Sequence, residues 1–137
     1  MTVDGKIMVL LVDDDSAMRT AVGLHLQHLG FDVETACNGF EALGVLEGHT
    51  EPPGEARAAY DADVVLLDLL MPVMTGYEFL ERYPGPVPVV VMSGFAELAS
   101  MPRVPFAVVP KPMSMIDVAD TLRRAAGWRT ASDTVPQ

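Results

Sequence analysis

Five polar side chains stand at or just after the ends of short apolar runs in this sequence. They are an acid pair, a lone acid, a hydroxyl and a lysine: Asp13, Asp14, Asp68, Ser93 and Lys111. If the runs that precede the acids are neighbouring strands, at least three carboxylates share one small crevice. Like charges at such short separations need a compensating cation. The pattern therefore predicts an acidic, cation-binding pocket.

The apolar runs have the length and composition of strands in a parallel sheet. Residues 63–68 are rich in Val and Leu, which is typical of a strand that is buried on both faces. Four further strands are predicted, one of them an alternating edge strand: residues 6–12, 31–36, 87–92 and 106–109. Parallel strands end at the same edge of a sheet, where open α/β sheets bind their ligands. Asp68 is therefore expected at a ligand-binding edge.

Segments with helical periodicity separate these strands. They lie around residues 16–29, 39–48, 77–83 and 114–126, and Ser16 is expected to cap the first of them. The segment between the fourth and fifth strands, residues 95–103, is limited by Pro102 to roughly two turns, so its helix should be short or degenerate. The alternation predicts an α/β fold with a five-stranded parallel sheet and helices on both faces.

Length and composition indicate one globular domain. Half of the 137 residues are hydrophobic, and the net charge of −10 argues against nucleic acid or an anionic membrane as a direct partner. Cys37 is the single cysteine and cannot form an internal disulfide, and no apolar run is long enough to span a bilayer. We expect a cytoplasmic domain over residues 6–128, with an N-terminal extension (1–5), a flexible tail (129–137) and no membrane insertion.

Four motifs together resemble the receiver domain of bacterial two-component response regulators over roughly residues 6–127. They are Val12-Asp13-Asp14-Asp15, Asp68 in Leu-Asp-Leu-Leu-Met-Pro with Gly76 beyond it, Met92-Ser93-Gly94, and Lys111-Pro112. The resemblance implies a flavodoxin-like sheet of order 2-1-3-4-5, in which the first and third strands lie side by side. It also implies a role for each matching residue.

By this resemblance, Asp68 accepts a phosphoryl group from a histidine of a sensor kinase or a histidine phosphotransfer protein. Mg²⁺ would be held by Asp13, Asp14, Asp68 and the backbone carbonyl of Leu70. Lys111 and Ser93 would each contact a phosphoryl oxygen, because positioning and charge neutralisation are most of what phosphoryl transfer requires. The domain would be a switch rather than an enzyme, and its output partner is not identified.

Several positions depart from the family pattern. Leu70 and Phe95 are large and apolar where the family often has polar side chains that flank the phosphorylated acid, so slow loss of phosphate is expected. Val108 stands where the family usually has an aromatic residue of the signalling switch. The segment before Lys111 is short and contains prolines, as in receivers fused to hybrid sensor kinases more than in transcriptional regulators.

Two other functions remain alternatives to the phospho-acceptor. One is a pseudo-receiver, which regulates a partner without phosphorylation, although none of the five site residues is missing. The other is a magnesium-dependent phosphatase of the haloacid dehalogenase type, which also uses an aspartyl nucleophile. That family requires a second acid two residues after the nucleophile, where this chain has Leu70.

Overall fold

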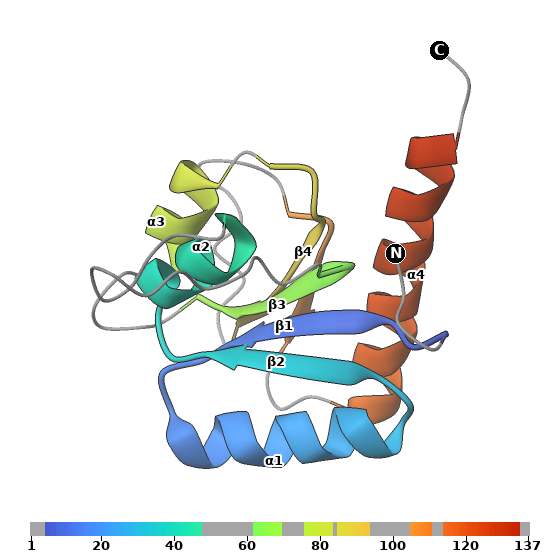
Figure 1. Ribbon diagram of the computed structural model, residues 1–137. Coiled ribbons are helices and arrows are strands. Elements are labelled where there is room, and N and C mark those ends of the chain that lie inside the picture. The colour runs from blue at the N-terminus through green and yellow to red at the C-terminus, as the bar shows by residue number, and fades with distance from the viewer. Residues whose placement is uncertain are drawn as a thin grey trace.

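Five parallel strands form the centre of the fold (Figure 1). The computed structural model describes residues 5–47, 62–69, 76–83, 85–93, 105–110 and 114–134. The strands are β1 (Met8–Val12), β2 (Asp32–Ala36), β3 (Val64–Asp68), β4 (Val89–Ser93) and β5 (Ala107–Pro110). Their order in the sheet is β2-β1-β3-β4-β5, so the expected order 2-1-3-4-5 is confirmed.

Helices cover both faces of the sheet (Figure 1). They are α1 (Ser16–His28), α2 (Gly39–Glu47), α3 (Gly76–Arg82) and α4 (Met115–Thr134). α1 and α4 pack on one face, and α2 and α3 pack on the other. Across the described ranges, no helix combines the length and the apolar character that crossing a bilayer demands. The helix expected between β4 and β5 falls within residues 94–104, which lie outside the described residues.

Alternation along the strands divides the core into two layers. Val9 and Leu11 of β1 pack with α1 and α4, whereas Leu10 and Val12 pack with α2 and α3. Every residue of β1, β3 and β4 is buried, which explains why these strands read as continuous apolar runs. β2 lies at one edge of the sheet, as its alternating sequence predicted, and its first four residues are only partly buried.

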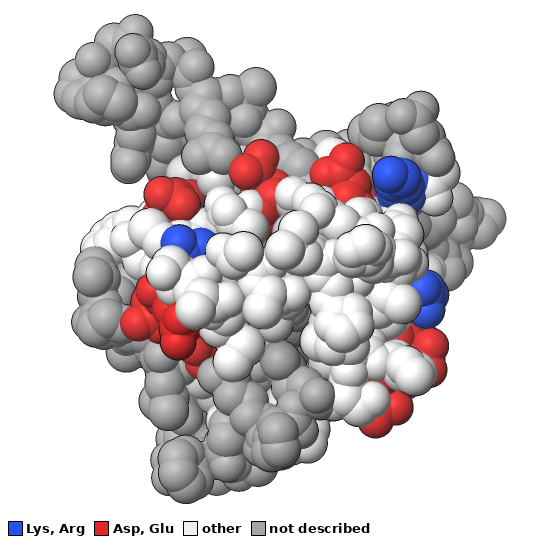
Figure 2. All heavy atoms as spheres, turned by 90° about the horizontal axis from the view of Figure 1, so that it is seen from below, with Lys and Arg blue, Asp and Glu red and all other residues white. Residues whose placement is uncertain are grey.

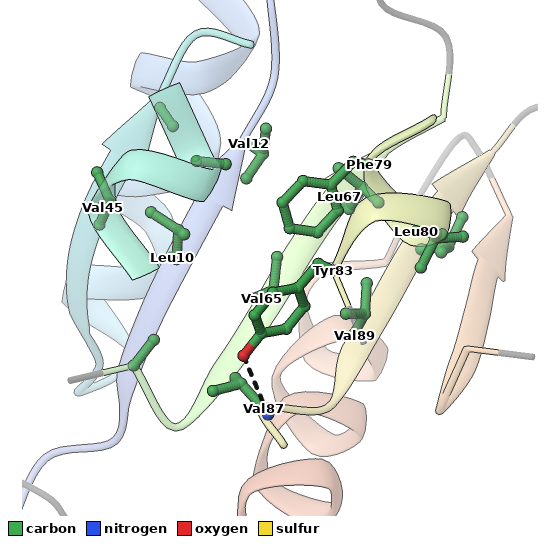
Figure 3. Packing of buried hydrophobic residues seen from close by; sticks show 14 of the residues in the cluster. Leu10, Val12, Val45, Val65, Leu67, Phe79, Leu80, Tyr83, Val87 and Val89 are labelled. Carbon is green, nitrogen blue, oxygen red and sulfur yellow. Dashed lines mark hydrogen bonds between the residues drawn. The ribbon is translucent and has the colours of Figure 1, made fainter. Parts of the chain in front are cut away.

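The layer on the side of α2 and α3 continues into the turn that enters β4 (Figure 3). The Tyr83 ring stacks on Phe79 with a centroid separation of 5.6 Å, and its hydroxyl oxygen accepts the N–H of Val87 at 3.3 Å. A Cβ atom at Gly85 would lie 2.6 Å from this ring, so any larger residue there would displace Tyr83. Tyr83 thus connects the end of α3 to the start of β4.

The last helix is longer than expected. α4 extends to Thr134, so residues 129–134 are helical where a flexible tail was expected over 129–137, and residues 135–137 lie outside the described residues. No proline lies between Met115 and Thr134, and Gly127 costs a helix only about 1 kcal/mol. The apolar periodicity ends near Ala126, but a helix can continue past its last buried residue until a helix-breaking residue ends it.

Candidate acidic phospho-acceptor site

The register of the sheet brings the ends of β1 and β3 together. Val12 pairs with Leu67, so the next residues, Asp13 and Asp68, leave adjacent strands at the same edge. On the other side of β3, Asp68 pairs with Met92. The acids that the sequence placed 55 positions apart therefore converge through strand pairing.

Three carboxylates form a compact group at this edge. Asp13, Asp14 and Asp68 each offer one oxygen, and these oxygens all lie within 4.8 Å of one another. Asp13 and Asp68 are buried, with 1% and 5% of their surfaces exposed, whereas Asp14 is exposed to solvent. A compact set of carboxylate oxygens suits a hard divalent cation such as Mg²⁺. The predicted grouping of the acids is present.

Ser93 ends β4 and lies one residue past the partner of Asp68 on that strand. Its side chain is buried, with 5% exposed, and it pairs with Pro110 of β5. Two further predicted site residues, Lys111 and Leu70, lie outside the described residues, as does Phe95. The roles of Lys111 and Leu70 stay predictions.

The acid run itself builds the turn from β1 into α1. Oδ1 of Asp15 accepts the N–H groups of Ala17 at 3.0 Å and Met18 at 3.1 Å, so Asp15 is the N-cap of α1. The expectation that Ser16 caps this helix is wrong by one residue, because Ser16 is already helical. An aspartate is also favoured here, since its charge faces the positive end of the helix dipole.

Arg19, near the start of α1, contacts this turn and is a residue that the sequence reasoning missed. Its Nη1 donates a hydrogen bond to the backbone carbonyl oxygen of Asp13 at 2.7 Å. The helix dipole disfavours a cation in the opening turns of a helix. An arginine so close to the start of a predicted helix therefore indicated, from the sequence alone, that its side chain makes another stabilising interaction.

Val108, at the position where the family usually has an aromatic residue, and the nearby Phe106 lie on different layers. Val108 is partly buried against the α2 and α3 layer, and its pairing with Val91 continues the regular register of β5. Phe106 precedes β5, is 36% exposed, and its ring lies 6.1 Å from that of Trp128 in α4. Residues two apart on a regular strand share a face, but Phe106 lies before β5 and contacts α4 instead of the layer that holds Val108.

Residues 9–122 match the family profile of the response regulator receiver domain. The chain belongs to this family. It is therefore a receiver domain of two-component signal transduction, and receiver domains interact with histidine kinases and output domains. The acid pair, Asp68 and Ser93 stand at the strand ends that the motifs of the sequence indicated.

Relatives of this receiver domain occur in proteins of different architecture. The chain is 34% identical over 127 residues to the sensor kinase CckA of Brucella abortus, which covers 87% of the chain but 12% of CckA. It is 35% identical over 153 aligned positions to the two-component response regulator ORR2 of Oryza sativa, which covers 88% of the chain and 60% of ORR2. The chain thus spans only part of the length of these relatives.

Solved structures share the fold of this receiver domain. The chemotaxis protein CheY4 of Vibrio cholerae is 27% identical and superimposes with a TM-score of 0.68, covering 88% of this chain and 99% of CheY4. The receiver domain of the hybrid histidine kinase CckA is 25% identical with a TM-score of 0.66, covering 87% of this chain and 98% of that domain. Both single receivers and receivers of larger kinases therefore resemble this chain.

Proposed function

We propose that this receiver domain is a phospho-acceptor in which Asp68 takes a phosphoryl group from a phosphohistidine donor. The observation that carries the proposal is the group of three carboxylate oxygens from Asp13, Asp14 and Asp68 at the carboxyl edge of the sheet. The donor is a sensor histidine kinase or a histidine phosphotransfer protein. The domain does not turn over a substrate of its own, since the phosphoryl group is the signal.

Asp68 is the nucleophile of the transfer. A carboxylate oxygen attacks phosphorus without a general base, a new O–P bond forms, and the P–N bond to the donor histidine breaks. The electron pair of that P–N bond stays on the imidazole nitrogen of the donor. The product is an acyl phosphate on Asp68, whose burial limits the access of bulk water.

The main obstacle to this reaction is electrostatic, because a phosphoryl group must enter a pocket that already holds carboxylates. Mg²⁺ bound by Asp13, Asp14, Asp68 and the backbone carbonyl of Leu70 would neutralise that charge. Lys111 would place a further positive charge on a phosphoryl oxygen. Ser93, buried at the end of β4, would donate its hydroxyl to another oxygen.

Incubation with acetyl phosphate and Mg²⁺ followed by intact mass measurement tests the proposal. The wild-type protein should gain the mass of one phosphoryl group, and Asp68→Asn should gain none. Asp120→Asn is a matched control, because Asp120 is an exposed acid of α4 that pairs with Arg123 and should leave labelling unchanged. Labelling of Asp68→Asn, or equal labelling in excess chelator, would refute this function. Absence of any labelling would favour a pseudo-receiver.

The donor must contact the rim of the acidic pocket, because its histidine has to reach Asp68. Met18 in the first turns of α1 is 38% exposed, and Ile116 at the start of α4 is 70% exposed. α1 carries no Asp, Glu or Lys. Figure 2, seen from the side on which α1 lies, shows an uncharged centre with acidic and basic groups towards the margins. We propose that these two apolar side chains form the donor-docking surface.

Comparing a protein donor with acetyl phosphate distinguishes an effect on donor docking from an effect on phosphoryl transfer itself. Met18→Asp and Ile116→Asp should slow phosphorylation by a protein donor on the order of tenfold, while phosphorylation by acetyl phosphate is unchanged. Trp128→Asp is the matched control, since Trp128 is an exposed aromatic residue of the same helix, about 18 Å further along α4. Equal effects of the Ile116 and Trp128 substitutions would exclude this docking surface.

A further inference from the structure

Three hydrogen bonds fix Asp13 in the turn that also carries Asp14. The N–H of Asp13 donates to the carbonyl oxygen of Ala36 at 3.1 Å, which extends the pairing of β1 with β2 by one residue. Oδ1 of Asp13 accepts the N–H of Asp15 at 3.0 Å. The carbonyl oxygen of Asp13 accepts Nη1 of Arg19 at 2.7 Å. The backbone and the side chain of Asp13 are thus both fixed by hydrogen bonds.

Arg19 is itself held in place by the start of α1. Its N–H donates to the carbonyl oxygen of Asp15 at 2.8 Å, and Asp15 caps the same helix. The hydrogen bonds therefore close a loop that runs from Asp13 to Asp15, into α1, and back to Asp13 through the Arg19 side chain. Asp14 lies inside this loop, so its backbone is restrained although its side chain is exposed.

We propose that Arg19 is a positioning residue for the cation site formed by Asp13, Asp14 and Asp68. By holding the Asp13 carbonyl group, it sets the direction in which the two neighbouring carboxylates point. A charge-assisted hydrogen bond from a planar guanidinium is well suited to this task, because it is short and loses little freedom on formation. The inference rests on the proposed function, since it concerns the same cation.

The direction in which Mg²⁺ affinity changes on removal of Arg19 distinguishes a positioning role from a purely electrostatic one. A guanidinium near the acid group repels Mg²⁺, so if charge were its only influence, removing Arg19 would tighten Mg²⁺ binding. If Arg19 orients the ligands, its removal weakens binding, because outer partners of metal ligands typically contribute 10–100-fold in affinity. With both effects present, we expect Arg19→Ala to bind Mg²⁺ on the order of tenfold more weakly.

A Mg²⁺ titration followed by calorimetry, and by the NMR shifts of the Asp14 and Asp15 amides, measures this effect. Arg19→Lys should recover most of the affinity, to within about threefold of the wild type, since it keeps a charged donor. Arg124→Ala is the matched control: it removes the same charge from α4, where Nη2 of Arg124 donates to Oγ1 of Thr121 at 3.3 Å. Its affinity should equal that of the wild type.

Unchanged or tighter Mg²⁺ binding by Arg19→Ala would overturn the inference and leave the proposed function standing. A lower free energy of unfolding in chelator with unchanged affinity would likewise overturn it, because Arg19 would then be only structural. Wild-type protein that binds no Mg²⁺ would refute the proposed function and this inference together. If the alanine variant does not fold, Arg19→Gln, which removes the charge but keeps much of the side chain, is judged by the same outcomes.

Discussion

Two buried aspartates bracket β3, and they have different described neighbours. Asp63 stands just before the strand with 4% of its surface exposed, and Asp68 ends it with 5% exposed. Oδ2 of Asp63 accepts the N–H of Met8 at 2.8 Å, and the N–H of Asp63 donates to the carbonyl oxygen of Met8 at 2.7 Å. Asp63 therefore joins the start of β3 to the start of β1.

Asp68 instead stands among other acids. Its oxygen lies within 4.8 Å of carboxylate oxygens from Asp13 and Asp14. The comparison teaches that burial alone does not identify a functional acid. A carboxylate that accepts a backbone N–H stabilises the fold, whereas one that is grouped with like charges is unfavourable without a cation and so indicates a binding site.

The largest expected difference between the two acids is in phosphorylation. Asp68→Asn should lose labelling by acetyl phosphate completely, because the amide is no nucleophile towards phosphorus. Asp63→Asn should be labelled to the wild-type level, since its amide oxygen still accepts the Met8 N–H. Intact mass measurement checks both. Loss of labelling in Asp63→Asn with the fold retained would show that the two ends of β3 are coupled.

The free energy of unfolding should depend more on Asp63 than on Asp68, the reverse of what we expect for phosphorylation. Asp63→Ala removes a charged acceptor and leaves the N–H of Met8 unsatisfied, so the free energy of unfolding should fall by about 2 kcal/mol. Asp68→Ala removes one of three neighbouring carboxylates, so in chelator it should leave the free energy of unfolding unchanged or raise it. Urea unfolding measures both values. A larger loss for Asp68→Ala would contradict this division of roles.

Magnesium should stabilise most strongly the proteins in which all three carboxylates of the acid group are present. At five times its dissociation constant, Mg²⁺ should raise the free energy of unfolding by about 1 kcal/mol in the wild type and in Asp63→Asn. Asp13→Asn and Asp68→Asn should show a clearly smaller increase, because each removes an anionic ligand. Thermal unfolding with Mg²⁺ or chelator tests this. An equal increase in all four proteins would place the cation elsewhere.

The smallest effect is expected at the turn that enters β4. Tyr83→Phe removes the hydroxyl that accepts the Val87 N–H but keeps the stacking on Phe79 (Figure 3). The free energy of unfolding should fall by about 0.5–1 kcal/mol, with Mg²⁺ affinity unchanged. Urea unfolding and a Mg²⁺ titration measure the two quantities. A shift in Mg²⁺ affinity would mean that this turn influences the acid group.

Much of the architecture could be predicted because local periodicity encodes it. The apolar run that ends at Asp68 indicated a buried strand, the alternation over residues 31–36 indicated an edge strand, and the structure has both. Element ends were predicted less well. The cap of α1 is Asp15 rather than Ser16, and α4 continues to Thr134, because these limits depend on single hydrogen bonds and on the absence of a helix breaker.

The sequence by itself determined which side chains follow the strands, and so the kind of chemistry available at the sheet edge. Only the tertiary structure decided which of them meet. Pairing of β1 with β3 brings Asp13 and Asp14 to Asp68, and the same pairing gives Asp63 a backbone partner in Met8. The contact of Arg19 with the Asp13 carbonyl likewise arises only once α1 is in place. The physical reason is that the periodicity of apolar residues along a segment determines which face of that segment is buried. Contacts between distant residues depend instead on how the strands pair and where the helices pack.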